Sequence, residues 1–189
     1  MERIRTFFQK YADLSDQDWA AISSRFSRHE IAKKAFTLQV GQVENFVSFI
    51  EEGIVRYFIP KDDDKEITFE LTFADDFMGA YDSFLTRQPS SYCVQALSHT
   101  VLWRLSYDDV QSLYRDTKLG NFMGRVACER LYLEKAQREL SFLTENAEQR
   151  YLRLFTEQPN LVKHIPLKYI ASYIGVTPQA LSRIRKRIS

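Results

Sequence analysis

The stretch IPLKYIASYIGVTPQALSRIRKRI, residues 165–188, constrains the fold more tightly than any other part of the chain. Two short helices that meet at a steep angle need a small residue where they touch and a turn residue that tolerates positive φ. Ala171 and Gly175 are placed for these roles. Thr177 is suited to cap a second helix, and Pro178 takes the first-turn position, where a missing N–H costs nothing. The segment therefore predicts a helix-turn-helix.

The second helix of this motif is expected to present a polar, basic stripe. If Leu181, Ile184 and Ile188 face inward, the 3.6-residue period turns the polar positions outward. Gln pairs with adenine and Arg with guanine through two hydrogen bonds each, and further cations neutralise phosphates. The residues expected at DNA are Thr177, Gln179, Ser182, Arg183, Lys186 and Arg187. The alternative is a pair of surface helices with a solvated basic face.

Charge is unevenly distributed, although 26 basic and 25 acidic residues leave a net charge of only +1. No acidic residue follows Glu157, and six cations beyond it give this tail a charge of +6. Residues 1–157 hold 20 basic and 25 acidic residues, a charge of −5. A basic end on an acidic body favours polyanion binding with a salt-dependent affinity. A disordered basic tail is the competing explanation, but regularly spaced apolar residues argue against it.

The length of 189 residues and the 44% hydrophobic content predict one full domain and a small one. No apolar run approaches the roughly 20 residues that cross a bilayer, and the N-terminus lacks the apolar stretch of a secretory signal. We expect a cytoplasmic protein with no membrane partner. Cys93 and Cys128 are far apart in sequence and are expected to be buried thiols, with redox sensing as the alternative.

The N-terminal part of the chain changes from a helical to a strand pattern. Ser15 and Asp18 resemble a capping box, and from about Arg28 apolar and polar residues alternate. Strands are expected at residues 35–40, 45–60, 65–73, 92–97 and 100–106, with turns at Gly41, Gly53, 60–65 and 87–90. Several short strands at this spacing indicate a sandwich or jelly roll rather than a parallel sheet.

The pattern becomes helical again beyond Ser106, with an apolar heptad seam broken by Glu129. We expect this seam to form a dimer interface, since helix-turn-helix proteins gain affinity by presenting two recognition helices to two half-sites. The expected interface residues are Leu119, Phe122, Val126, Leu133, Ala136 and Leu140. In the alternative, the helix simply packs on its own strands. A shorter amphipathic helix is expected to begin at Asn146 and to end at residues 158–160.

This order of parts resembles the Crp/Fnr family of bacterial transcription regulators over nearly the whole chain. The matching pieces are residues 49–58, 75–79 with 81–85, 92–97 and the helix-turn-helix. The resemblance implies an α+β fold: a double-stranded β-helix (jelly-roll) sensor domain at 1–115, a dimerisation helix at 116–145 and a DNA-binding domain at 146–189. It further implies a homodimer on a palindromic operator of double-stranded DNA, with RNA polymerase as a further partner.

The phosphate-binding cassette of the family is where this chain departs from the pattern. Cyclic nucleotide binders in the family carry a Glu just after the Gly matched by Gly79, and an Arg just before the Ser matched by Ser91. This chain has Ala80 and Ser90 there. Asp82 adds a like charge, and only a nearby Arg87 would substitute for the missing cation. We expect weak or no cyclic nucleotide binding in a pocket comprising Gly79, Ala80, Tyr81, Asp82, Arg87, Ser90 and Ser91.

Other cofactors and other functional classes leave few traces in the sequence. There is no Cys cluster for iron–sulfur binding, and three scattered His residues offer neither a cupin-like metal site nor a catalytic triad. We therefore expect no enzyme and no metal, while haem and an unknown small-molecule effector stay open. The alternative function is a small-molecule or cyclic nucleotide sensor that acts through protein contacts without binding DNA.

Overall fold

A computed structural model describes residues 1–61, 65–157 and 164–188. The chain divides into two compact units, one formed by residues 1–57 and 71–130 and the other by 58–70 and 131–189. Among the described helices, none is long and apolar enough to span a membrane.

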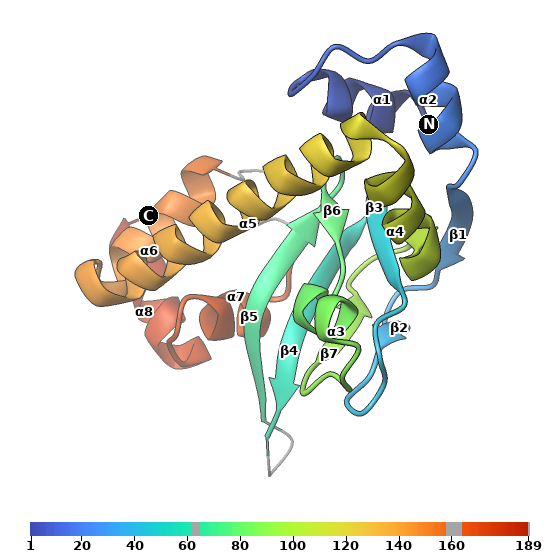
Figure 1. Cartoon of the computed structure of the whole chain (residues 1–189). Coiled ribbons are helices and arrows are strands. Elements are labelled where there is room, and N and C mark those ends of the chain that lie inside the picture. Colours follow the sequence, from blue (N-terminus) through green and yellow to red (C-terminus); the bar gives the residue numbers. More distant parts are fainter. Residues whose placement is uncertain (62–64, 158–163, 189) are drawn as a thin grey trace. The chain divides into compact units, whose positions relative to one another are not determined.

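The first unit holds most of an eight-stranded antiparallel β roll, so the expected α+β jelly-roll fold is confirmed (Figure 1). One sheet has the strand order β1-β8-β3-β6 and the other β2-β7-β4-β5. The strands are β1 (Ser27–Ile31), β2 (Phe36–Leu38), β3 (Phe46–Glu52), β4 (Ile54–Pro60), β5 (Glu66–Phe73), β6 (Phe77–Met78), β7 (Cys93–Ala96) and β8 (Thr100–Ser106). The strand patterns read from the sequence all form strands, and β1 and the two-residue β6 are additional.

Helices cover one face of the first sheet. The two N-terminal helices, α4 and the first part of α5 enclose a core in which Phe7, Phe49, Phe84 and Leu105 are buried. The helices of this unit are α1 (Glu2–Gln9), α2 (Asp16–Ser23), α3 (Tyr81–Thr86), α4 (Tyr107–Asp116) and the start of α5 (Lys118–Thr144). The capping box at the start of α2 is confirmed, because Ser15 Oγ accepts the N–H of Asp18.

The second unit contains residues 58–60 of β4, residues 66–70 of β5, the end of α5 and three further described helices. These helices are α6 (Ala147–Glu157), α7 (Leu167–Tyr173) and α8 (Pro178–Ile188). The expected end of the shorter helix at residues 158–160 lies outside the described residues.

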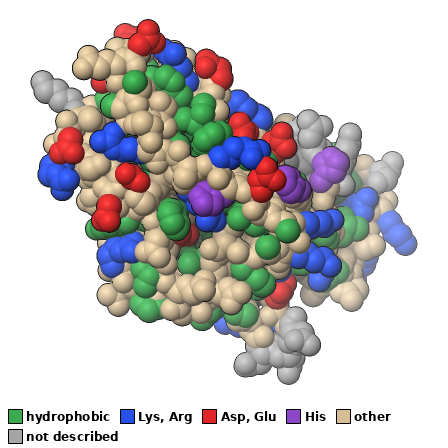
Figure 2. Space-filling model, turned by 90° about the vertical axis from the view of Figure 1, so that its right-hand side faces the viewer, with side chains coloured by type: hydrophobic (Ala, Val, Ile, Leu, Met, Phe, Trp, Pro, Cys, Tyr) green, Lys and Arg blue, Asp and Glu red, His purple; other side chains and the backbone are tan. Residues whose placement is uncertain are grey.

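Figure 2 shows a face of the molecule on which basic and acidic side chains are interspersed, consistent with the balanced composition.

One expectation about the thiols is wrong. Cys93 is buried, but Cys128 is exposed on α5. The sequence could not distinguish these cases, because the exposure of a residue on a long helix depends on which of its faces meets the rest of the fold.

Candidate nucleic-acid interface and effector cassette

The last two helices meet as the sequence predicts. Ile170, Ala171 and Leu181 are fully buried, and Gly175 has a φ of +78° in the turn between α7 and α8. A Cβ built on Gly175 would lie 2.7 Å from Cε1 of Phe142, so glycine is favoured both by backbone conformation and by the close approach of that ring. The arrangement is compatible with a helix-turn-helix.

The start of α8 is fixed by its cap. Thr177 Oγ1 accepts the N–H of Ala180 at 3.2 Å, and Pro178 is the first helical residue. Of the three apolar residues expected to face inward, Leu181 is buried and Ile184 half-buried, whereas Ile188 is 38% exposed. The last position differs because it ends the helix, beyond the packing that encloses Leu181.

All six residues expected at DNA lie exposed on α8 or at its cap: Thr177, Gln179, Ser182, Arg183, Lys186 and Arg187. They differ in how engaged they are. Arg187 forms an ion pair with Glu148 of α6. Within the described residues, the side chains of Arg183 and Lys186 form no hydrogen bond or ion pair, so their cationic groups are available to a polyanion.

Two half-buried arginines hold the end of α7, a feature that the sequence did not reveal. Arg138 donates through Nη2 to the carbonyl of Tyr173 at 3.0 Å, and its guanidinium lies 4.1 Å from the Tyr173 ring. Arg150 donates through Nε to the carbonyl of Ile174 at 3.0 Å. Burial lowers the pKa of Arg138, which its contacts with Tyr173 partly offset. Cations at carbonyls of a helix C-terminus are favourable, so these arginines anchor the first helix of the motif.

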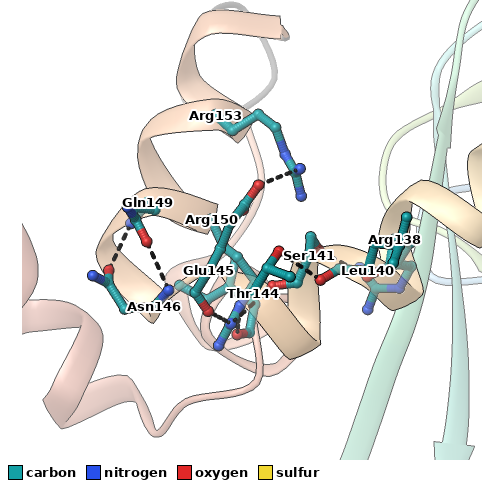
Figure 3. Close-up of polar contacts among 10 residues, drawn as sticks. Arg138, Leu140, Ser141, Thr144, Glu145, Asn146, Gln149, Arg150 and Arg153 are labelled. Atoms are coloured by element: carbon teal, nitrogen blue, oxygen red, sulfur yellow. Dashed lines mark hydrogen bonds and ion pairs between the residues drawn. The ribbon is translucent and has the colours of Figure 1, made fainter.

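The junction between α5 and α6 is also held by polar contacts (Figure 3). Asn146 Oδ1 accepts the N–H of Gln149 at 3.0 Å, and Gln149 Oε1 accepts the N–H of Asn146 at 2.9 Å. Arg153 forms an ion pair with Glu145 at 2.7 Å. This reciprocal cap sets where α6 begins.

A hairpin contact adds to these anchors within the second unit. Ser172 of α7 accepts the backbone N–H of Thr68 at 2.8 Å and donates its hydroxyl to the carbonyl of Glu66 at 3.2 Å. Lys135 of α5 forms an ion pair with Glu70 of the same strand. Because these partners are more than 60 residues apart in sequence, no local pattern could have predicted them.

The expected dimer seam falls into two parts on α5. Leu119 and Phe122 are partly buried and pack against the core of the first unit, and Val126 is half-buried. Farther along the helix, Leu133 and Leu140 are each 57% exposed. Leu143, the last residue of the heptad seam, is exposed as well, and so are Tyr132 and Phe142 on this part of α5. An apolar surface is thus concentrated on the second half of the helix.

At Gly79 and Ala80, the backbone N–H groups of the cassette are bound by other side chains of the roll. Tyr57 of β4 is 2% exposed, and its hydroxyl accepts the N–H of Gly79 at 2.9 Å. Ala80 is fully buried, and its N–H is directed to the carboxylate of Glu44 at 3.3 Å. Two backbone donors at the start of α3 are therefore already satisfied.

The second side of the cassette is engaged as well. Asp82 accepts the hydroxyl of Tyr92, and Ser90 Oγ both donates to the carbonyl and accepts the N–H of Tyr92. Arg87 donates to the carbonyl of Glu44 at 2.6 Å and to Asn45 Oδ1 at 2.5 Å, with its guanidinium 4.3 Å from the Tyr107 ring.

The remaining cassette residues contribute no cation. Tyr81 is half-buried with its hydroxyl 3.4 Å from Cys128 Sγ, and burial raises its pKa. Ser91 is exposed. The structure therefore brings the expected cassette residues together, but their polar groups bind one another and neighbouring side chains.

Comparisons with known proteins agree with this architecture. Residues 28–117 match the family model of the cyclic nucleotide-binding domain. A sequence comparison with curated proteins finds no significant match.

Three solved structures show the same fold over most of the chain. A putative transcriptional regulator of the crp/fnr family from Eubacterium rectale has a TM-score of 0.72 and 15% identity, covering 97% of this chain and 87% of that one. A CooA mutant from Carboxydothermus hydrogenoformans has a TM-score of 0.69 and 16% identity, covering 92% and 80%. The c-di-GMP-responsive regulator CLP of Xanthomonas campestris has a TM-score of 0.67 and 14% identity, covering 89% of each chain.

The family match lies on the β roll, and the structural matches extend from the roll through the long helix to the C-terminal helices. Residues 28–117 are thus similar to cyclic nucleotide-binding domains, and the chain has the fold of these solved regulator structures.

Proposed function

We propose that this protein is a sequence-specific, homodimeric DNA-binding transcription regulator that does not depend on a cyclic nucleotide. The observation that carries the proposal is the exposed α8 surface, where Gln179, Ser182 and Arg183 lie on a helix whose opposite side is anchored through Leu181. Such a helix has the dimensions and chemistry to enter a major groove. RNA polymerase is the further partner that we expect for such a regulator.

Dimerisation is supported by the exposed apolar surface on the second half of α5. Leu133, Leu140 and Leu143 would lose much of their exposed area if two copies of the helix packed along this surface. Two copies of α8 would then read two half-sites about 34 Å apart.

The occupied cassette supports independence from cyclic nucleotide. A buried phosphodiester needs a cation or several free N–H donors, since an unpaired charge in a low-dielectric site is costly. Here the Gly79 N–H is bound by Tyr57, the Ala80 N–H is bound by Glu44, and Arg87 is engaged with the 44–45 segment. The missing ribose and phosphate ligands therefore have no replacement at this site.

The test is a selection of the purified protein against a random duplex pool without added nucleotide, followed by sequencing of the retained DNA. An inverted repeat is expected, and sedimentation of the complex is expected to give two protein chains per site. Arg183→Ala serves as the matched variant, because it removes a group with no partner in the described part of the protein. Absence of enrichment, with or without cAMP and cGMP, would contradict the proposal and favour a sensor that signals through protein contacts.

A further inference from the structure

A cleft of about 390 Å³ opens between β2, the 42–46 segment and β8. This volume lies in the range of about 300–1,000 Å³ that is typical of small-molecule sites. Leu38, Val43 and Phe46 contribute apolar walls. Its polar lining consists of Thr37, Gln42, Glu44, Asn45 and Arg104. None of these eight residues belongs to the expected cassette.

Arg104 is the cation of this cleft. Its side chain donates no hydrogen bond to any residue that the structure describes, and its Nε is buried without a partner. The guanidinium lies over the ring of Phe46, 5.2 Å from the centroid. Burial lowers the pKa of Arg104, and the nearby Glu44 carboxylate offsets only part of this shift. An oriented guanidinium with free N–H groups is suited to bind a carboxylate through two hydrogen bonds.

Glu44 places an acceptor near the same cleft. Its carboxylate accepts the N–H groups of Phe46 and Ala80 at 3.1 and 3.3 Å and forms no ion pair with Arg104. A carboxylate has about four lone-pair sites, so this group can accept a further donor. A ligand with only a negative charge would be repelled by this group, whereas a ligand that also carries a cation would be attracted to it.

The backbone of Glu44 connects the cleft to α3. Its N–H donates to Ser83 Oγ at 3.0 Å, and its carbonyl accepts from Arg87 Nη1 at 2.6 Å. Together with the Ala80 contact, three hydrogen bonds join one residue of the cleft wall to the short helix of the cassette. A ligand that moves Glu44 would therefore also move α3, the short helix of the cassette.

We propose that this cleft is a ligand site for a small α-amino acid with an apolar side chain, and that such a ligand is the effector. The carboxylate would pair with Arg104, the ammonium group would face the carboxylate of Glu44, and the side chain would contact Leu38, Val43 and Phe46. The role as effector rests on the proposed DNA-binding function, whereas the binding site itself does not.

Binding is tested first by isothermal titration and amide chemical shifts on the full chain. The probes are L-phenylalanine and L-leucine, each compared with its analogue lacking the amine or the carboxylate. At least one amino acid is expected to bind with a Kd of about 1 mM or tighter and to shift the amides of 37–46. Its two analogues should bind at least about tenfold weaker, a difference of ~1.4 kcal/mol. No saturable binding of either amino acid, or equal binding of the analogues, would overturn the proposal without any variant being needed.

Two variants then test whether Arg104 binds the ligand. Arg104→Gln is expected to abolish saturable binding, and Arg28→Gln is the control, since Arg28 is exposed and pairs with Glu30 outside the cleft. Equal binding by both variants would refute the role of Arg104. The effector role is read from DNA affinity on the selected operator, where at least a threefold change on adding the amino acid is expected. A DNA affinity that the amino acid leaves unchanged would refute only its role as effector. If the protein binds no DNA, the proposed function is refuted, and the titration alone decides whether the cleft binds an amino acid.

Discussion

Removal of the Arg183 guanidinium separates DNA reading from folding. Arg183 is exposed on α8 and has no side-chain partner among the described residues, so Arg183→Ala should leave the free energy of unfolding nearly unchanged. A bidentate contact to guanine contributes about 1–3 kcal/mol, so a dimer with two such contacts should lose about 2–6 kcal/mol of specific binding. At about 1.4 kcal/mol per tenfold change, this is a loss of roughly 30-fold to 10⁴-fold on the selected operator.

The assay is a fluorescence anisotropy titration of the selected operator and of a random duplex, each over a series of salt concentrations. Arg183→Ala should weaken operator binding far more than random binding and relax one base position in each half-site. Lys186→Ala is the comparison on the same helix: it should weaken both duplexes alike and lower the salt slope by about one for each phosphate that the variant no longer neutralises.

A third variant uses the ion pair seen in the structure. Arg187 pairs with Glu148, so part of its contribution to DNA binding is offset by breaking that pair. We expect Arg187→Ala to have a smaller effect on affinity than Lys186→Ala. If Arg183→Ala and Lys186→Ala lower both affinities by the same factor, the assignment of Arg183 to base reading is wrong.

Further expectations concern the dimer, the cassette and pH. Leu133→Lys, on a residue 57% exposed, should dissociate the dimer in sedimentation while leaving the helical content in circular dichroism almost unchanged; a dimer that persists would contradict the proposed surface. Tyr57→Phe removes the acceptor of the half-buried Gly79 N–H and should cost about 0.5–1.5 kcal/mol in urea unfolding; a cost near zero would show that this hydrogen bond contributes little. Burial raises the pKa of Glu44 above its ordinary 4.5, despite the backbone donors and Arg104 that lower it. The folded state then holds its proton to higher pH than the unfolded state, so stability should fall as pH rises from about 4.5 through the raised pKa. Glu44→Gln should flatten this dependence in denaturation curves, and an equal slope in both proteins would refute it.

The sequence by itself determined the elements whose signals are local. The small, turn and cap residues of the helix-turn-helix lie within a few positions of one another, and Ala171, Gly175 and Thr177 occupy the predicted roles. The apolar patterns predicted these strands correctly, since at least one face of each is enclosed by the roll and both faces of β4 are buried. The short β1 and β6 gave weaker patterns and were not predicted.

Tertiary structure alone decided which side chains occupy the cassette and which line the cleft. The Tyr57 hydroxyl meets Gly79, and Glu44 meets Ala80, through hydrogen bonds that span 22 and 36 residues. Arg104 joins the cleft through the pairing of β8 with β3. Such contacts are fixed by strand order and register, which bring distant residues together, and a single sequence contains no periodic signal for them.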